Sequence, residues 1–261
     1  MKEGDIVRVD YEVWIKDTDE LYDTTMEEVA KEHGIYDPSK KYRSVVVIVG
    51  ESDLLDDVEN AIKNGNVGDE IEVELPPEKA YGPRDPKLIR VHSYRELARL
   101  DIEPEVGKEV YIRGMMGKII SVTPGRVLVD YNHPLAGKTV KYKLYIREVA
   151  EEPLAKVKAI IDMHYADAEN FEINVEGEEI TIKVEGKAKF DPNWAMAKPK
   201  IIRDLRKYVG NLTIRFVEEY PKREEVEEEK PEEKGEEKEE KEEKSEGVSE
   251  DSTDTIEGAE E

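Results

Sequence analysis

The chain contains no cysteine, which excludes disulfides, thiolate nucleophiles and cysteine-based metal sites. It has only four histidines, at positions far apart in the sequence. No HExxH pair, GxxxxGK[ST] loop, GxGxxG loop or serine elbow is present, so the motifs of zinc proteases, nucleotide-binding folds and serine hydrolases are missing. We therefore expect no metal site and no cofactor.

Long apolar runs are also absent. No stretch approaches the roughly 18 consecutive apolar residues of a transmembrane helix, and the N-terminus, MKEGDIVRVDY, has no signal-peptide core. The formal net charge of −24 argues against binding to a nucleic-acid backbone, because that needs clustered Lys and Arg. We expect a cytoplasmic protein with no membrane partner, and the charge disfavours a nucleic-acid partner.

The acidic charge is concentrated at one end. Residues 221–261 contain 20 Asp and Glu against 7 Lys and Arg, so −13 of the −24 lies there. A segment of this composition cannot bury enough apolar surface to fold. We predict a disordered acidic tail over 221–261.

Alternating apolar and polar residues predict strands in the first part of the chain. DIVRVDYEVWI (5–15) and DEIEVEL (69–75) alternate, and SVVVIVG (44–50) is a short apolar run typical of a buried strand. Between them, apolar residues in 53–63 fall at helical spacing. We predict one short amphipathic helix there, with Ser52 as its N-cap.

A different style of sequence begins after AYGPRDP (80–86). Four short β-like segments, LIRVHS, EVYIRG, GKIISVT and GRVLVDY, are separated by glycine and proline, and YKLYIREV (142–149) then resumes the earlier style. This predicts a small all-β domain over 87–134, inserted into a host domain formed by 1–86 and 135–152.

A third region begins at Pro153. Apolar residues at helical spacing are followed by FEINVEGEEITIKVEG, which is typical of a hairpin, by a helical pattern over 194–208, and by the strand-like NLTIRFVEEY. We predict a compact αββαβ domain over 153–220, so the fold class as a whole is α+β.

A set of short motifs, in order, carries the functional signal: VDY (9–11), LYD (21–23), VVVIVG (45–50), the apolar face at 54, 55 and 58, KAYG (79–82) and VKYKL (140–144). Together they resemble the FKBP-type peptidyl-prolyl isomerases, in which a half-wrapped antiparallel sheet and one short helix enclose an aromatic-lined groove. The positions that fall on that family's groove are Tyr11, Tyr22, Asp23, Leu54, Leu55, Tyr81 and Tyr142. Val58 occupies a position that is a tryptophan in many members, and this departure puts tight binding of bulky macrolides in doubt.

The stretch VDYNHPLAGKTVKY (129–142) is longer than a plain hairpin needs. About fifty residues separate AYG from NHPLAG, an arrangement similar to the SlyD-like branch, where an insert-in-flap chaperone domain replaces a short loop. On this interpretation NHPLAG is the re-entry junction. Pro134 stiffens it, Gly137 supplies a positive φ, and Asn132 and His133 hydrogen-bond backbone groups. The C-terminal region is similar to long-chain archaeal members, whereas the His-rich, nickel-binding tail of bacterial SlyD proteins has no counterpart.

The resemblance implies an enzyme that accelerates X–Pro isomerisation in unfolded or nascent chains, with chaperone activity from the insert. It implies catalytic roles for Tyr11, Asp23, Leu55, Tyr81 and Tyr142. It implies substrate contacts by Tyr22, Val49, Leu54, Val58, Ile112, Met115, Met116 and Ile119, although these methionines and isoleucines could instead form the insert's core.

Three alternatives stay open. The chain could be a holdase that binds unfolded chains without isomerase activity, and His133 could act as a catalytic base. The αββαβ domain could bind RNA through a basic helix face formed by Lys198, Lys200, Arg203, Arg206 and Lys207, but it has no GXXG loop. We favour dimerisation or client contact by this domain through an exposed segment, Trp194–Met196.

Overall fold

The computed structural model describes residues 1–165 and 171–220. The predicted acidic tail lies outside the described residues. Within those ranges no helix is long and apolar enough to cross a membrane.

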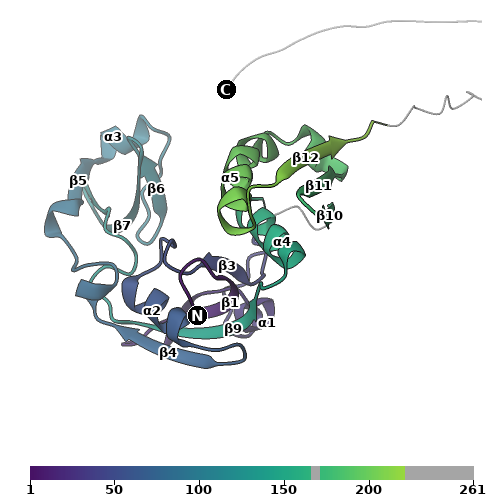
Figure 1. Cartoon of the computed structure of the whole chain (residues 1–261). Helices are drawn as coiled ribbons and strands as arrows, with labels where there is room; N and C mark the ends of the chain where they lie inside the picture. The colour runs from purple at the N-terminus through teal and green to yellow at the C-terminus, as the bar shows by residue number, and fades with distance from the viewer. Residues whose placement is uncertain (166–170, 221–261) are drawn as a thin grey trace, which may run out of the picture. The chain divides into compact units, whose positions relative to one another are not determined.

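The host domain is a five-stranded antiparallel sheet (Figure 1). Its strands are β1 (Ile6–Ile15), β2 (Glu20–Thr24), β3 (Val45–Ile48), β4 (Glu70–Leu75) and β9 (Val140–Val149). The order is β2-β1-β9-β4, and β3 pairs with β1 beyond the end of β2. Strand β1 precedes the inserted segment and β9 follows it. Their pairing at the centre of the sheet therefore holds the two parts of the host domain together.

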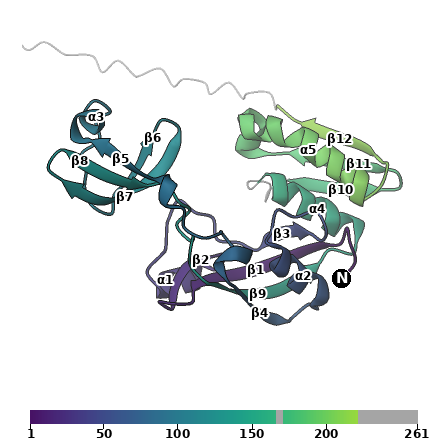
Figure 2. The ribbon, with the colours of Figure 1, turned by 90° about the vertical axis from the view of Figure 1, so that its left-hand side faces the viewer.

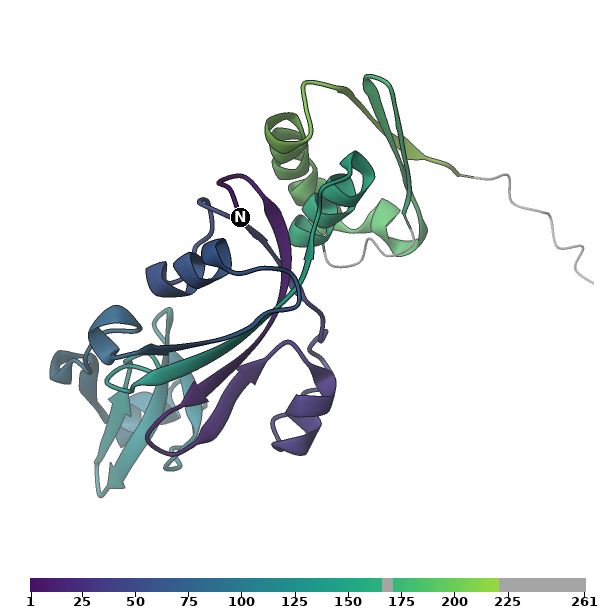
Figure 3. The ribbon, with the colours of Figure 1, turned by 60° about the horizontal axis from the view of Figure 1, so that its bottom comes forward.

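Helix α2 (Asp56–Asn64) lies across one face of this sheet (Figure 3). It buries Val58 and Ile62 in the core that the sheet forms with Val7, Val9 and Leu144. The helix starts three residues later than predicted, with Leu55 at the N-cap position. Ser52 is not the cap, and its hydroxyl is buried without a hydrogen-bond partner. Three acidic residues in the first turn favour the observed start, because they complement the positive end of the helix dipole.

A second helix, α1 (Glu27–Glu32), follows β2, and two short 3₁₀ turns, η1 (Pro77–Lys79) and η2 (Pro86–Leu88), lead from β4 to the inserted segment. Gly137 has φ of 76°, as predicted for the return junction. Its amide donates to the Gly82 carbonyl, so the outgoing and returning connections are hydrogen-bonded to each other.

The inserted segment forms a separate four-stranded antiparallel sheet (Figure 2). Its strands are β5 (Ile89–Ser93), β6 (Glu109–Ile112), β7 (Met115–Thr123) and β8 (Arg126–Asp130), in the order β5-β8-β7-β6. The prediction of an all-β segment missed one element, the short helix α3 (Tyr94–Ala98). Ser93 caps this helix by accepting from the Glu96 amide at 3.1 Å, and Leu97 enters the small core.

The C-terminal domain has the predicted αββαβ order. It contains α4 (Pro153–His164), β10 (Glu172–Glu176), β11 (Glu179–Val184), the 3₁₀ segment η3 (Gly186–Phe190), α5 (Pro192–Tyr208) and β12 (Thr213–Glu218). Strands β11 and β12 are parallel, and both helices lie on one face of the sheet (Figure 2).

The predicted exposure of Trp194 is wrong. Trp194 is 1% exposed and lies at the centre of the domain core. The helix begins at Pro192, so Trp194 falls on the same face as Ala197, Ile201 and Leu205, and that face packs inward.

The C-terminal domain and the host sheet share one hydrophobic core. Ile6 of β1, Ile48 of β3 and Ala150 belong to the same buried cluster as α4 and α5. At the edge of this contact Arg8 forms an ion pair with Asp162, and Glu51 is bonded to Lys207 and Tyr208. Because apolar burial is the main stabilising term in folding, this contact fixes the C-terminal helices beside β3.

Candidate functional site

A groove of about 170 Å³ opens between the host sheet and α2. Its lining combines an aliphatic base with four tyrosines and one carboxylate. The lining residues are Val9, Tyr11, Val13, Tyr22, Asp23, Val45, Val47, Leu54, Val58, Ile62, Tyr81, Tyr142 and Leu144. They come from β1, β2, β3, β9, α2 and two loops, so the groove exists only in the folded chain.

Seven of the predicted site residues line this groove: Tyr11, Tyr22, Asp23, Leu54, Val58, Tyr81 and Tyr142. Two others do not. Val49 is 1% exposed and is buried in the core between the sheet and α2. Leu55, the N-cap of α2, is half-buried and packs against the same core, whereas its neighbour Leu54 is exposed and lines the groove.

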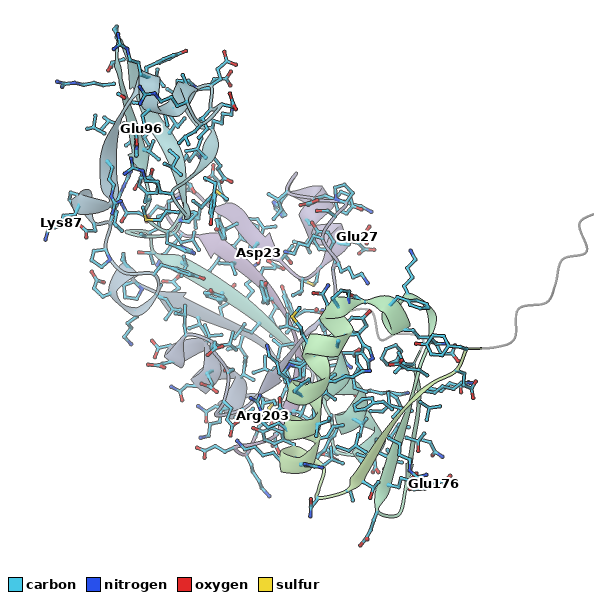
Figure 4. The ribbon with its side chains drawn as sticks, turned by 90° about the horizontal axis from the view of Figure 1, so that it is seen from above. Asp23, Glu27, Lys87, Glu96, Glu176 and Arg203 are labelled. Carbon is cyan, nitrogen blue, oxygen red and sulfur yellow. The ribbon has the colours of Figure 1, made fainter. Side chains whose placement is uncertain are left out.

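Two hydrogen bonds between side chains order the polar edge of the groove. The Tyr11 hydroxyl donates to Oδ2 of Asp23 at 2.8 Å, and the hydroxyls of Tyr81 and Tyr142 are 2.8 Å apart. Asp23 is labelled in Figure 4 and is also bonded by Lys40 and by the Thr24 amide. These contacts fix the carboxylate at one place on the rim.

The groove keeps Tyr11 and Tyr142 protonated. Burial, followed by the hydrogen bond to Asp23, raises the pKa of Tyr11 well above its ordinary value. Burial, followed by the hydrogen bond to Tyr81, does the same to the pKa of Tyr142. Both groups are therefore neutral hydrogen-bonding phenols at physiological pH. The arrangement is suited to holding a neutral polar group on an apolar floor.

A histidine that the groove motifs did not include lies directly behind Tyr81. The ring of His133 stacks on the ring of Tyr81, with centroids 4.2 Å apart and planes 4° apart. Its Nδ1 accepts from the Leu135 amide at 3.1 Å, and burial lowers the pKa of His133. His133 therefore supports Tyr81 from the re-entry junction. Sequence reasoning gave His133 only backbone contacts or a role as a base.

Asn132 joins the two connections to the inserted segment. Its Oδ1 accepts from the Asp85 amide at 2.8 Å, and its Nδ2 donates to the Asp85 carbonyl at 3.0 Å. This reciprocal pair imitates the hydrogen bonds of two paired strands, and the ion pair between Arg84 and Asp130 lies beside it. The prediction that Asn132 and His133 satisfy backbone groups at the junction is confirmed.

The inserted sheet divides its apolar residues between two faces. Ile112 and Ile119 are 1% and 0% exposed, so the prediction that they contact substrate is wrong for this fold. They form the small core with Leu97, Val110, Val127 and Val129. Alternation along a strand sends every second side chain to the opposite face, and the core takes the positions that include these two isoleucines.

The outer face of the same sheet carries the exposed apolar side chains. Met116 is 60% exposed and lies opposite Tyr111, which is 65% exposed, on the neighbouring strand. Val91 and Ile120 are also exposed, and Met115 is half-buried. We call Val91, Tyr111, Met116 and Ile120 the insert face. Sequence reasoning named only Met116 of these four, although the buried position of Ile112 implies that Tyr111 points outward.

The groove and the insert face are both suited to binding a polypeptide segment that has apolar side chains and a neutral, hydrogen-bonding backbone. Neither contains a side-chain nucleophile activated by a neighbouring base, because the groove carboxylate is bonded to a tyrosine and a lysine. Within residues 1–165 and 171–220 no cluster of three or more metal-ligating side chains is present.

Comparison with protein-family models gives three matches along the chain. Residues 1–107 match the model described as FKBP-type peptidyl-prolyl cis-trans isomerase. Residues 90–135 match the FKBP26 IF domain, and residues 153–221 match the FKBP26 C-terminal domain.

Individual relatives agree with these matches. The chain is 42% identical over 150 residues to a short-type peptidyl-prolyl cis-trans isomerase from Methanocaldococcus jannaschii, an alignment that covers 57% of this chain and 94% of the relative. It is 32% identical over 106 residues to the FKBP-type 16 kDa peptidyl-prolyl cis-trans isomerase of Escherichia coli K12, covering 39% and 70%. It is also 32% identical over 113 residues to the SlyD isomerase of the same strain, covering 41% and 57%.

Proposed function

The chain belongs to the FKBP-type peptidyl-prolyl cis-trans isomerases, and from that premise we propose that its groove accelerates X–Pro isomerisation in unfolded or nascent polypeptides. The observation that supports this most directly is the convergence of four tyrosines, Asp23 and eight aliphatic side chains, from elements far apart in the sequence, around one hollow. The physics of the peptide bond explains why such a hollow is catalytic.

Resonance across the peptide bond sets a rotation barrier of about 18–20 kcal/mol. At X–Pro bonds the resulting isomerisation takes tens to hundreds of seconds, which is slow enough to limit folding. The twisted transition state has lost the conjugation and is less dipolar than either planar isomer. A dry apolar groove therefore disfavours the planar states relative to the twisted one, and each 1.36 kcal/mol of difference gives about a tenfold acceleration.

In this proposal Val58 and the neighbouring aliphatic residues receive the proline ring, and Leu54 and Tyr22 close the mouth. If Tyr142 donates to Tyr81, the hydroxyl hydrogen of Tyr81 is free to hold the substrate carbonyl. Asp23 positions Tyr11 at the opposite rim. The mechanism requires no proton abstraction, so His133 has a positioning role, not that of a base.

We propose that the insert, residues 87–134, supplies chaperone activity by collecting unfolded chains on the insert face. Exposed apolar side chains on a small sheet support this, since clustered exposed apolar surface marks interaction sites. A flexible thioether such as that of Met116 can adapt to many sequences. In this proposal the isomerase domain consists of residues 1–86 and 135–152, and the C-terminal domain consists of residues 153–220. The protein acts in the cytoplasm. Self-association through the C-terminal domain stays a prediction, now without Trp194.

The test is a protease-free isomerisation assay on a short X–Pro peptide. We expect the exchange rate between cis and trans to rise in proportion to protein concentration. The exposed insert face supports one rival, a holdase without catalysis. Unchanged exchange, together with suppressed aggregation of an unfolded protein, would establish the holdase and overturn the isomerase proposal.

A further inference from the structure

A second cavity, of about 540 Å³, adjoins the groove. Four of its lining residues, Tyr11, Val45, Val47 and Leu54, also line the groove. The two hollows therefore share a boundary. A polypeptide that leaves the groove over this boundary passes directly into the second cavity.

One side of the second cavity runs along the edge of β3. All four residues of this strand, Val45–Ile48, line it, although successive side chains of a strand point to opposite faces. A hollow in contact with all of them must therefore follow the strand edge. Among the described residues β3 pairs only with β1, so every second residue directs its N–H and C=O away from the sheet, except that the Ile48 carbonyl at the end of the strand accepts from the Glu51 amide. Such an edge can accept an extended peptide.

The opposite side comes from the C-terminal domain. Met163 and His164 of α4, with Arg203, Asp204 and Tyr208 of α5, line it; Arg203 is labelled in Figure 4. Asp204 is buried and is bonded to Nε2 of His164 at 2.6 Å and to Nε of Arg203 at 2.7 Å. These bonds fix the polar wall before any ligand arrives.

The charges around the second cavity favour a cation. The lining contains Glu51, Asp53 and Asp204 against Arg203 and a histidine. Glu51 is occupied by Lys207 and Tyr208, and Asp204 by Arg203 and His164. Among the described residues this leaves Asp53, on the exposed loop before α2, as the acidic group available to a ligand.

We propose that the second cavity is a substrate subsite. It binds the residues that flank the X–Pro bond, extended along β3, and it prefers a basic side chain directed toward Asp53. A four-residue strand is about 13 Å long, so the subsite holds about three or four substrate residues. This inference rests on the proposed function, because the groove must hold the proline for its flank to reach β3.

The test uses the full chain and a peptide series with one X–Pro core. Each peptide carries Lys, Ala or Glu at one position, two to four residues from the proline on either side. Both kcat/KM, from protease-free exchange, and Kd, from fluorescence anisotropy, are measured. At the position that reaches Asp53 we expect the Lys peptide to have a kcat/KM roughly two- to fivefold higher, and a Kd lower by the same factor, than the Glu peptide, the range for one partly exposed charge pair.

Two variants separate a local contact from a general charge effect. Asp53→Lys should reverse the preference, so that the Glu peptide has the higher kcat/KM and the lower Kd. Asp56→Lys makes the same charge change three residues later, outside both cavities, and should keep the wild-type order. No preference at any position, or the same reversal in both variants, would overturn the subsite.

A four-residue peptide without flanks separates this inference from the proposed function. If the full chain fails to isomerise it, the proposed function fails, and the Kd series still decides whether the subsite exists. If it is isomerised while the flanked peptides show no preference, only the subsite is wrong.

Discussion

The groove and the insert face present apolar surface in opposite ways. The groove is a hollow whose tyrosines are held by Asp23 and by each other, so its shape is fixed before a substrate binds. The insert face is an open sheet surface on which Tyr111 and Met116 stand exposed beside each other. A fixed hollow selects one small group, whereas an open surface accepts many sequences.

The difference suggests a division of labour. Stabilising a twisted imide requires preorganised surroundings, and of these two regions the groove provides them. Capturing unfolded chains requires exposed apolar area and adaptable side chains, and these are found at the insert face. Substitutions in the two regions should therefore affect different substrates.

The largest effect is expected from a charge placed at the groove. Leu54→Asp puts a carboxylate beside the proline, and desolvating it costs about 2 kcal/mol or more, so kcat/KM on a short X–Pro peptide should fall about thirtyfold. The matched control is Leu55→Asp, whose side chain packs against the core. It should lower the urea midpoint of unfolding more than it lowers the activity of the folded fraction. Similar losses of activity in both folded variants would contradict the placement of Leu54.

A smaller effect, confined to protein substrates, is expected from the insert face. The double change Tyr111→Ser and Met116→Ser removes two exposed apolar side chains. Because each would be partly buried against a bound client, the loss of their transfer free energy should lower the rate of a proline-limited refolding reaction about fivefold. The control removes two exposed apolar side chains of the C-terminal domain, Leu154→Ser and Met196→Ser, and should leave that rate unchanged. Equal losses in the two double variants would remove the special role of the insert face.

Hydrogen bonds at the groove rim should contribute less. Tyr81→Phe removes one donor to the substrate carbonyl, and Asp23→Ala removes the carboxylate that accepts from the Tyr11 hydroxyl. Because a single hydrogen bond contributes about 0.5–1.5 kcal/mol, each change should lower kcat/KM on the short peptide roughly three- to tenfold. Exchange spectroscopy of that peptide measures both. A complete loss of activity in Tyr81→Phe would show that the hydroxyl does chemistry that the apolar groove does not.

The smallest effect concerns pH and His133. Burial against Tyr81 lowers its pKa in the folded state, so the unfolded chain binds the proton more readily. The stability that this histidine contributes is present above its ordinary pKa of about 6.5 and is lost as the pH falls through the lowered value. Urea midpoints should therefore drop between pH 8 and pH 5 by slightly more in the wild type than in His133→Asn, which keeps an acceptor for the Leu135 amide. An equal drop in both proteins would show that His133 does not take part.

The order of short motifs predicted the fold better than any single pattern did. Tyr11, Asp23, Tyr81 and Tyr142 come from separate elements, yet the motifs that contain them resemble one family, and that resemblance implied the groove. Helical and strand periodicity located most elements, because the core requires one apolar face from each. The helix α3 was missed because five residues are too few to show a period.

The errors arise where tertiary contacts, which a local pattern does not contain, decide the structure. Periodicity states which residues share a face but not which face is buried, so substrate contact and core stayed open for Ile112 and Ile119, and Trp194 was predicted to be exposed. Ser52 is a residue type that commonly caps helices, but α2 begins at Asp56, so Leu55 occupies the N-cap position. The stack of His133 on Tyr81 and the second cavity depend on contacts between distant segments, which one sequence does not reveal.

The most direct test of the division between groove and insert is to delete residues 88–131 and bridge the ends with a short loop. Asp85 and Asn132 already exchange hydrogen bonds, so the ends are close enough to join. The shortened chain should isomerise a four-residue X–Pro peptide at the full rate and lose about tenfold or more on a proline-limited refolding protein. Equal loss on both substrates, or equal retention on both, would contradict the account.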